Sequence, residues 1–279
     1  MDEFPLQQAD FFARLDWRPD RMLLDDLVFR LEHNRNDQDW DLGQDCFVFY
    51  KIKPLVEQYQ RFWSLQAAFR ARNVFELGLW DGGSTAFWFE YLQPEKHVAI
   101  DITDRQDSPY FTQYKGRRNL EYRIKTYWGT DQSDKARLRE LVQAEFDGPL
   151  DLVIDDASHM YALTKASFEA LFPMLRPGGF YVIEDWAWSH WKEFHGREHP
   201  WAHETPLTKL ICELVEATGS STTLINNLFI YQGFTVVERG GMEHLSSGSF
   251  VLDEHISRRP ERFDLRRYLG NMRRRHVGS

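Results

Sequence analysis

Two pairs of acidic residues each follow a short apolar run, and they are the part of the sequence best suited to chemistry. Asp155 and Asp156 follow the first run, and Glu184 and Asp185 follow the second. If both runs are parallel strands of one sheet, their carboxyl ends open into the same crevice. Four carboxylates crowded there would repel one another and raise one another's pKa values. A hard divalent cation relieves this repulsion, and oxygen ligands favour Mg²⁺, with Mn²⁺ or Ca²⁺ as substitutes.

His159 lies three positions past Asp156 and is the candidate general base. A metal can hold two neighbouring substrate oxygens and lower the pKa of a hydroxyl, whose proton His159 would then accept. Ser158 beside it does not indicate a hydrolase, because the sequence has no G-x-S-x-G elbow. Asp155 is assigned to the cofactor side of the crevice, although capping of a strand end explains an acid there equally well.

A glycine-rich segment joins an earlier apolar run to a helical pattern. Gly78 allows a sharp turn, and Gly82 and Gly83 allow close backbone approach at the helix entry. Ser84 or Thr85 can cap N–H groups there. Dinucleotide binders use three glycines to hold an anionic pyrophosphate, which the acidic Glu76 would serve poorly. A cofactor with a cationic sulfonium and an ammonium group fits Glu76 better. A purely structural strand-to-helix turn is the alternative.

Two further acids extend the predicted cofactor site. Asp101 ends the next apolar run, 25 positions after Glu76, where an acid commonly accepts hydrogen bonds from ribose hydroxyls. Asp131 follows the third run and is expected near an adenine amino group, with a helix N-cap as the alternative role. The pattern E-x-G-x-x-x-G-G-S that begins at Glu76 resembles the first motif of class I methyltransferases, which implies S-adenosylmethionine as the cofactor.

The elements that must position these residues alternate between short apolar runs and amphipathic stretches. This alternation predicts a parallel sheet with crossover helices. Two β-rich runs split by Gln232-Gly233 predict a hairpin, so the expected fold class is α/β: a Rossmann-like, mostly parallel sheet with an antiparallel edge hairpin. Strands are expected at 73–78, 97–101, 121–127, 150–155, 179–184, 224–231 and 234–239, and helices at 84–92, 109–116, 133–145, 162–174 and 206–218.

Three regions are expected along the chain. Residues 1–70 are predicted to form a helical N-terminal extension or cap, because apolar positions recur at helical spacing in 22–31 and 54–71. Residues 71–250 are predicted to form the methyltransferase domain. Residues 251–279 are predicted to be an extended basic tail.

Two strings carry a more specific resemblance than the glycine turn. IDDASH (154–159) and YVIEDW (181–186), with LRPGG between them, resemble metal-dependent sugar O-methyltransferases of macrolide and related antibiotic pathways. They also resemble the wider rhamnosyl O-methyltransferase and cephalosporin-hydroxylase-like group. The likeness covers about residues 73–240 and does not extend to the first 70 residues. It implies methyl transfer to a hydroxyl of a sugar on a secondary metabolite, with a catechol or other vicinal diol as the alternative acceptor.

The resemblance also assigns residues to roles. It implies that Asp156, Glu184 and Asp185 bind Mg²⁺ and that His159 is the base. One departure is Ala157, where the family often has Gly. Assembly as a homo-oligomer is likewise implied by resemblance alone.

The composition limits the partners. With 42% hydrophobic and 28% charged residues, the chain is expected to be globular. Its net charge of −9 argues against a nucleic-acid surface, and the arginines at 266–275 are expected to be a solvated end. Two cysteines, Cys46 and Cys212, cannot build a disulfide framework, so a reducing cytoplasm is expected. No signal peptide or spanning apolar segment is apparent, so no membrane association is expected.

Other classes of function stay open from the sequence alone. One is a non-catalytic binding protein that keeps the methyltransferase fold, and another is an NAD(P)-dependent oxidoreductase. The segment after the second acidic pair, residues 186–203, is rich in tryptophan and histidine and is expected to be an aromatic lid over the substrate. A plain surface loop and a zinc site are the alternatives for that segment.

Overall fold

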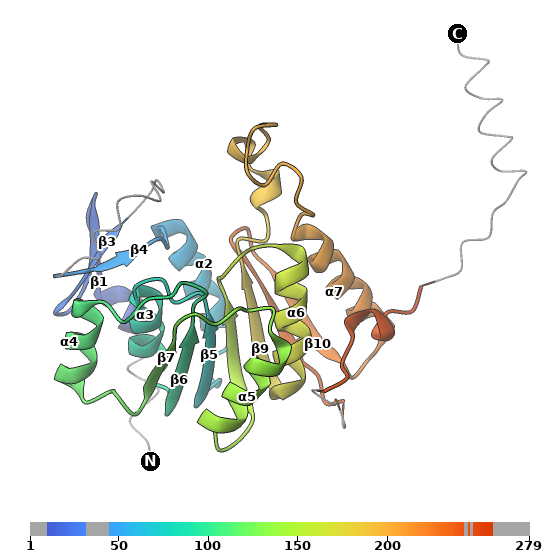
Figure 1. Ribbon diagram of the computed structural model, residues 1–279, viewed down its shortest axis with the longest axis horizontal. Helices are drawn as coiled ribbons and strands as arrows, with labels where there is room; N and C mark the ends of the chain where they lie inside the picture. Colours follow the sequence, from blue (N-terminus) through green and yellow to red (C-terminus); the bar gives the residue numbers. More distant parts are fainter. Residues whose placement is uncertain (1–9, 32–44, 243–244, 246–247, 259–279) are drawn as a thin grey trace, which may run out of the picture.

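A twisted sheet lies at the centre of the molecule. The structure, a computed structural model, describes residues 10–31, 45–242, 245 and 248–258. The strands of this sheet are β5 (Asn73–Leu77), β6 (Lys96–Ile100), β7 (Ile124–Tyr127), β8 (Leu150–Asp155), β9 (Leu175–Glu184), β10 (Ile225–Ile230) and β11 (Phe234–Arg239). Their order is β10-β11-β9-β8-β5-β6-β7 (Figure 1).

The pairing confirms the predicted fold class. β5 to β9 pair in parallel, and β11 and β10 add the antiparallel edge hairpin. The chain lays β6 and β7 on one side of β5 and then returns to place β8 and β9 on the other side. The strand order therefore reverses between β5 and β8, and ligands of open α/β sheets bind outside the carboxyl ends of strands at such a reversal.

Helices cover both faces of this sheet. α5, α6 and α7 bury apolar side chains against one face, and α2, α3 and α4 lie over the other (Figure 1). The predicted helices after residue 80 are all present, with ends that differ by a few residues. The helices that cover the sheet are α2 (Lys53–Ser64), α3 (Gly83–Leu92), α4 (Pro109–Arg118), α5 (Lys135–Glu145), α6 (Tyr161–Leu171) and α7 (Thr208–Ser220).

The N-terminal region differs from its prediction. The helix expected within 54–71 is confirmed as α2, but the helix expected over 22–31 is wrong. That segment is a β-hairpin within a second, four-stranded sheet. The strands of this sheet, in the order β1-β2-β3-β4, are β1 (Leu15–Trp17), β2 (Arg21–Leu24), β3 (Leu27–Leu31) and β4 (Phe47–Phe49).

Turn chemistry explains why a hairpin forms there. Leu24 pairs with Leu27, so Asp25 and Asp26 form a two-residue turn. Asp25 has φ 53°, a left-handed conformation that Asp tolerates better than most residues. The apolar residues of the segment had suggested helical spacing, but burial alternates along β2 and β3, as a half-buried strand requires.

Aromatic packing joins this small sheet to the main domain. Phe29 and Phe49 both contact Phe87 of α3, with ring centroids 6.5 and 5.3 Å apart. These rings belong to one buried cluster that continues through α2 to the central sheet. The N-terminal sheet therefore shares the core of the domain built on the central sheet.

Some predictions fall outside the described residues. They include most of the predicted basic tail, from residue 259 onward. Among the described residues, no helix combines the length and apolar character needed to cross a membrane.

Because the core is shared, truncating Phe29 is expected to destabilise the whole domain. Phe29→Ala should lower the free energy of unfolding by about 3–5 kcal/mol in a single urea transition, since Phe29 is fully buried. Tyr122→Ala is the control, because Tyr122 is 84% exposed. A separate early transition for the N-terminal sheet would contradict the shared core.

Candidate active site

One cavity of about 270 Å³ opens at the carboxyl ends of the strands where the strand order reverses. Its wall combines the glycine turn after β5, the end of β6, the segment after β7 and the acidic ends of β8 and β9. Residues 48–51 of the N-terminal region close another side. The residues predicted from sequence that line it are Gly78, Ser84, Asp101, Asp131, Asp156, Glu184 and Asp185.

The glycine turn lets two strands approach closely. Gly78 has φ +95°, and a Cβ on it would lie 2.2 Å from the carbonyl oxygen of Asp156. The Asp156 N–H in turn donates to the carbonyl of Leu77 at 2.9 Å. Any side chain at position 78 would therefore separate the cofactor turn from the acidic loop after β8.

The start of α3 has unmet hydrogen-bonding capacity. Gly82, at φ 92°, is the N-cap and supplies no side-chain hydrogen bond, and Gly83 follows it. The predicted capping by Ser84 or Thr85 is not observed, because the Thr85 hydroxyl donates to Glu76. The hydroxyl oxygen of Ser84 is buried without a hydrogen-bond partner among the described residues. Because Ser84 lines the cavity, this hydroxyl and the helix N–H groups fit a ligand with acceptor atoms.

Asp101 and Asp131 both reach the cavity wall. Asp101 accepts hydrogen bonds from the backbone N–H groups of Trp80 and Thr103, at 2.8 and 2.9 Å, which hold its carboxylate at the end of β6. Asp131 accepts from the N–H of Ser133 at 2.7 Å. The N-cap of α5, the alternative role for Asp131, belongs instead to Asp134.

Glu76 and Asp155 are placed differently from the other candidates. Both are buried and neither lines the cavity. Glu76 accepts a hydrogen bond from the hydroxyl of Thr85 at 2.7 Å and lies 3.0 Å from His97 Nε2. Asp155 accepts from the hydroxyl of Tyr181 at 2.8 Å, and burial raises the pKa of Asp155 to about 6. These contacts suit acids that hold the strand ends in place behind the cavity.

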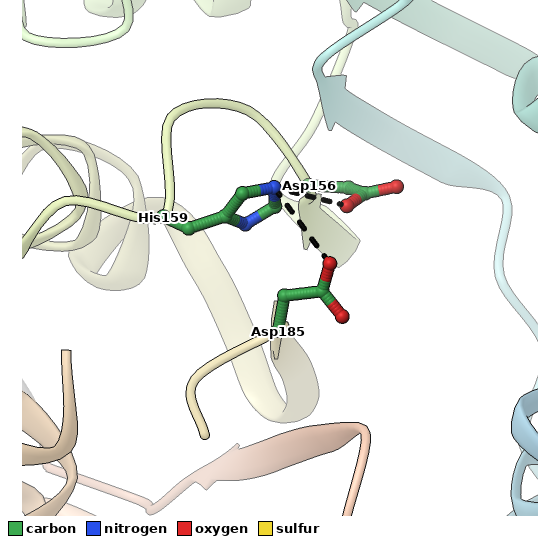
Figure 2. Close-up of side chains that lie close together, drawn as sticks. All are labelled: Asp156, His159 and Asp185. Carbon is green, nitrogen blue, oxygen red and sulfur yellow. Dashed lines mark ion pairs between the residues drawn. The ribbon is translucent and has the colours of Figure 1, made fainter. Parts of the chain in front are cut away.

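Asp156, His159 and Asp185 converge in the loops after β8 and β9 (Figure 2). His159 Nε2 lies 3.9 Å from Asp156 Oδ1 and 3.9 Å from Asp185 Oδ2. One ligand atom from each residue lies within 4.8 Å of the others, which fits a single metal ion. His159 and Asp185 have φ of 58° and 51°, so both loops turn sharply to bring the side chains together.

Glu184 makes contacts that the sequence analysis missed. Its carboxylate accepts hydrogen bonds from Lys51 Nζ at 2.6 and 2.7 Å and from the hydroxyl of Tyr59 at 2.7 Å. Lys51 also donates to Asp156 Oδ2 at 2.7 Å. Burial by itself lowers the pKa of Lys51, but the charges of Asp156 and Glu184 more than offset it and raise that pKa. No sequence motif marks Lys51, which simply follows the apolar run of β4.

The segment after β9 supports His159 from behind. The indole N–H of Trp188 donates to the carbonyl of His159 at 2.9 Å, and Trp188 is buried. Trp201 lies near both residues, with its ring centroid 6.4 Å from that of His159. The part of the chain between β9 and α7 projects beyond the end of the sheet (Figure 1). None of the residues described as lining the cavity comes from 186–203, so the aromatic lid stays a prediction.

Comparison with known proteins agrees with this architecture. Residues 75–186 match a family model described as a methyltransferase domain. Residues 75–186 therefore carry a methyltransferase domain, and the sheet order and the cavity at the strand reversal agree with the class I, S-adenosylmethionine-dependent type. The resemblance seen in the sequence motifs is thereby confirmed, and the NAD(P)-dependent oxidoreductase is disfavoured.

Among curated proteins, the chain is similar to several O-methyltransferases. It is 40% identical over 134 residues to the 8-demethyl-8-alpha-L-rhamnosyl tetracenomycin-C 2'-O-methyltransferase of Streptomyces olivaceus, covering 46% of this chain and 32% of the relative. It is 32% identical over 188 residues to the Mycinamicin VI 2''-O-methyltransferase of Micromonospora griseorubida, covering 60% of this chain and 44% of the relative. The chain therefore spans less than half the length of these relatives.

A solved structure extends the similarity to the fold. The MycE methyltransferase from the mycinamycin biosynthetic pathway, in complex with Mg, SAH and mycinamycin VI, has a TM-score of 0.52 and 29% identity. The alignment covers 71% of this chain and 52% of that chain.

Asp81 connects the N-terminal region to the cofactor turn and should make stability depend on pH. It accepts from the N–H groups of Val48 and Gly83, at 2.6 and 3.0 Å, and burial raises its pKa to about 7. The folded state then binds this proton more tightly than the unfolded state, so the contribution of Asp81 falls as pH rises from about 4 to 7.

Comparing wild type with Asp81→Asn isolates this contribution. The free energy of unfolding of wild type relative to the variant should decrease as pH rises toward about 7 and then level off. Urea titrations across this pH range provide the measurement. Parallel pH profiles of the two proteins would contradict the assignment.

Proposed function

We propose that this chain is a metal-dependent O-methyltransferase that moves the methyl group of S-adenosylmethionine to a hydroxyl of a sugar on a secondary metabolite. The observation that carries the proposal is that one cavity joins the glycine turn and Asp101 to the acidic residues Asp156 and Asp185. Methyl donor and acceptor hydroxyl would then meet beside a metal site. The sugar O-methyltransferases to which the chain is similar support this acceptor class.

The cofactor contacts follow from the cavity wall. Asp101 would accept hydrogen bonds from the ribose hydroxyls, and Asp131 would lie near the adenine. The unpartnered hydroxyl of Ser84 and the start of α3 would receive the carboxylate of the amino-acid part. Gly78 would allow the cofactor and the acidic loop to approach each other. The roles first expected for Glu76 and Asp155 become indirect, because both hold the strand ends behind the wall.

The metal would be held by carboxylate oxygens of Asp156 and Asp185. Their side chains are 24% and 37% exposed, so both can face a ligand in the cavity. Mg²⁺ suits such hard oxygen donors and would supply Lewis-acid activation of the acceptor hydroxyl. His159 would accept the proton of that hydroxyl at Nε2, which faces both carboxylates. Holding the methyl donor and the acceptor hydroxyl in the correct orientation would contribute further to the rate enhancement.

Methyl transfer from labelled S-adenosylmethionine to a panel of glycosides tests the function. Wild type should label a glycoside in the presence of Mg²⁺ and lose the activity in EDTA. His159→Ala should bind the cofactor with unchanged affinity in calorimetry but lower kcat by about 10²–10⁴-fold. Full activity of this variant would remove His159 from the role of base, and activity insensitive to EDTA would remove the metal.

Trp188 is expected to act as a positioning residue for His159. Trp188→Phe removes the indole N–H that donates to the His159 carbonyl, and it should lower kcat about five- to tenfold while leaving KM for the cofactor unchanged. Trp88→Phe is the matched control, because the Trp88 indole nitrogen is buried without a hydrogen-bond partner among the described residues. Equal loss in both variants would argue against positioning.

A further inference from the structure

A positively charged side chain already lies among the acidic residues of the metal site. Lys51 is 3% exposed and contacts carboxylate oxygens of Asp156 and Glu184 at 2.6–2.7 Å. It comes from the N-terminal region, just after β4, and not from the strand ends that supply the acids. Tyr59 of α2 adds a neutral hydrogen bond to Glu184. The carboxylate of Glu184 therefore already has hydrogen-bond donors and a counter-charge from the N-terminal region without a metal.

The two carboxylate oxygens of Asp156 face different neighbours, and each neighbour can be a cation. Its Oδ2 accepts a hydrogen bond from Lys51, whereas its Oδ1 faces His159 Nε2 and, with Asp185, forms the group that fits a metal. Glu184 is not part of that group. Lys51 and a divalent ion would therefore share Asp156, and they would repel each other at close range.

We propose that Lys51 is a resident cation that competes with the divalent metal for Asp156 and Glu184 and thereby sets the metal affinity of the site. The inference rests on the metal-dependent function proposed above. Asp156 and Asp185 are the carboxylates available to the metal while Lys51 is in place, and Glu184 becomes available only when Lys51 withdraws. Lys51 also lets the acidic strand ends fold without metal, because a buried carboxylate left without a partner is strongly destabilising.

Manganese binding tests the competition directly. Mn²⁺ can be titrated into the full chain and followed by the electron paramagnetic resonance signal of the unbound ion. Lys51→Gln and Lys51→Met should bind Mn²⁺ about tenfold more tightly than wild type, because a nearby positive charge is lost. Gln can still donate a hydrogen bond to Glu184, which protects the fold. Lys53→Gln is the matched control, since the side chain of Lys53 is 56% exposed.

Thermal unfolding adds a second readout. In EDTA the Lys51 variants should unfold at lower temperature than wild type, and Mn²⁺ should restore more of their stability than it adds to wild type. A lysine with only a structural role would leave Mn²⁺ affinity unchanged or weaken it, which would overturn the inference. Variants that stay unfolded even with Mn²⁺ would also overturn it, because the metal is expected to replace the missing charge.

The two proposals fail in different ways. If wild type and Lys51 variants bind Mn²⁺ equally, the inference about Lys51 fails while the metal-dependent function stands. If none of the proteins binds Mn²⁺, the metal-dependent function fails, and the inference fails with it.

Discussion

Three carboxylates meet at the ends of β8 and β9, and their negative charge has to be balanced where one of them is buried. Glu184 is 2% exposed, so water cannot stabilise its charge. Lys51 and Tyr59 supply the compensation through direct hydrogen bonds. Asp156 and Asp185 are more exposed and remain directed toward the cavity, where a divalent ion fits. The acidic site thus depends on a cation brought in from a distant part of the sequence.

The N-terminal region therefore helps to build the cavity as well as extending the fold. β4 and the residues after it form one wall of the cavity, and the N–H of Val48 donates to Asp81 in the cofactor turn. Aromatic contacts between β3, β4 and α3 hold that wall against the main domain. The glycine turn, the acidic cluster and the N-terminal sheet therefore pack as one connected unit.

Much of the fold could be predicted from local patterns. The alternation of apolar runs and amphipathic stretches located the central strands and most helices, because burial on both faces of a parallel sheet leaves nearly continuous apolar runs. The helix expected over 22–31 failed because several adjacent apolar residues suit either period, and the Asp25-Asp26 turn decided between them. Convergence of Asp156, His159 and Asp185 was predictable, since parallel strands end at the same edge.

The sequence by itself determined the sheet, the glycine turn and the acidic strand ends, because each depends on residue types that are close along the chain. Only the tertiary structure decided which acids face the cavity. It turned Glu76 and Asp155 toward buried hydroxyl groups, and it brought Lys51 to Glu184 across 133 positions of sequence. Such pairings leave no local signal, because they are set by the packing of two sheets and not by the spacing of neighbouring residues.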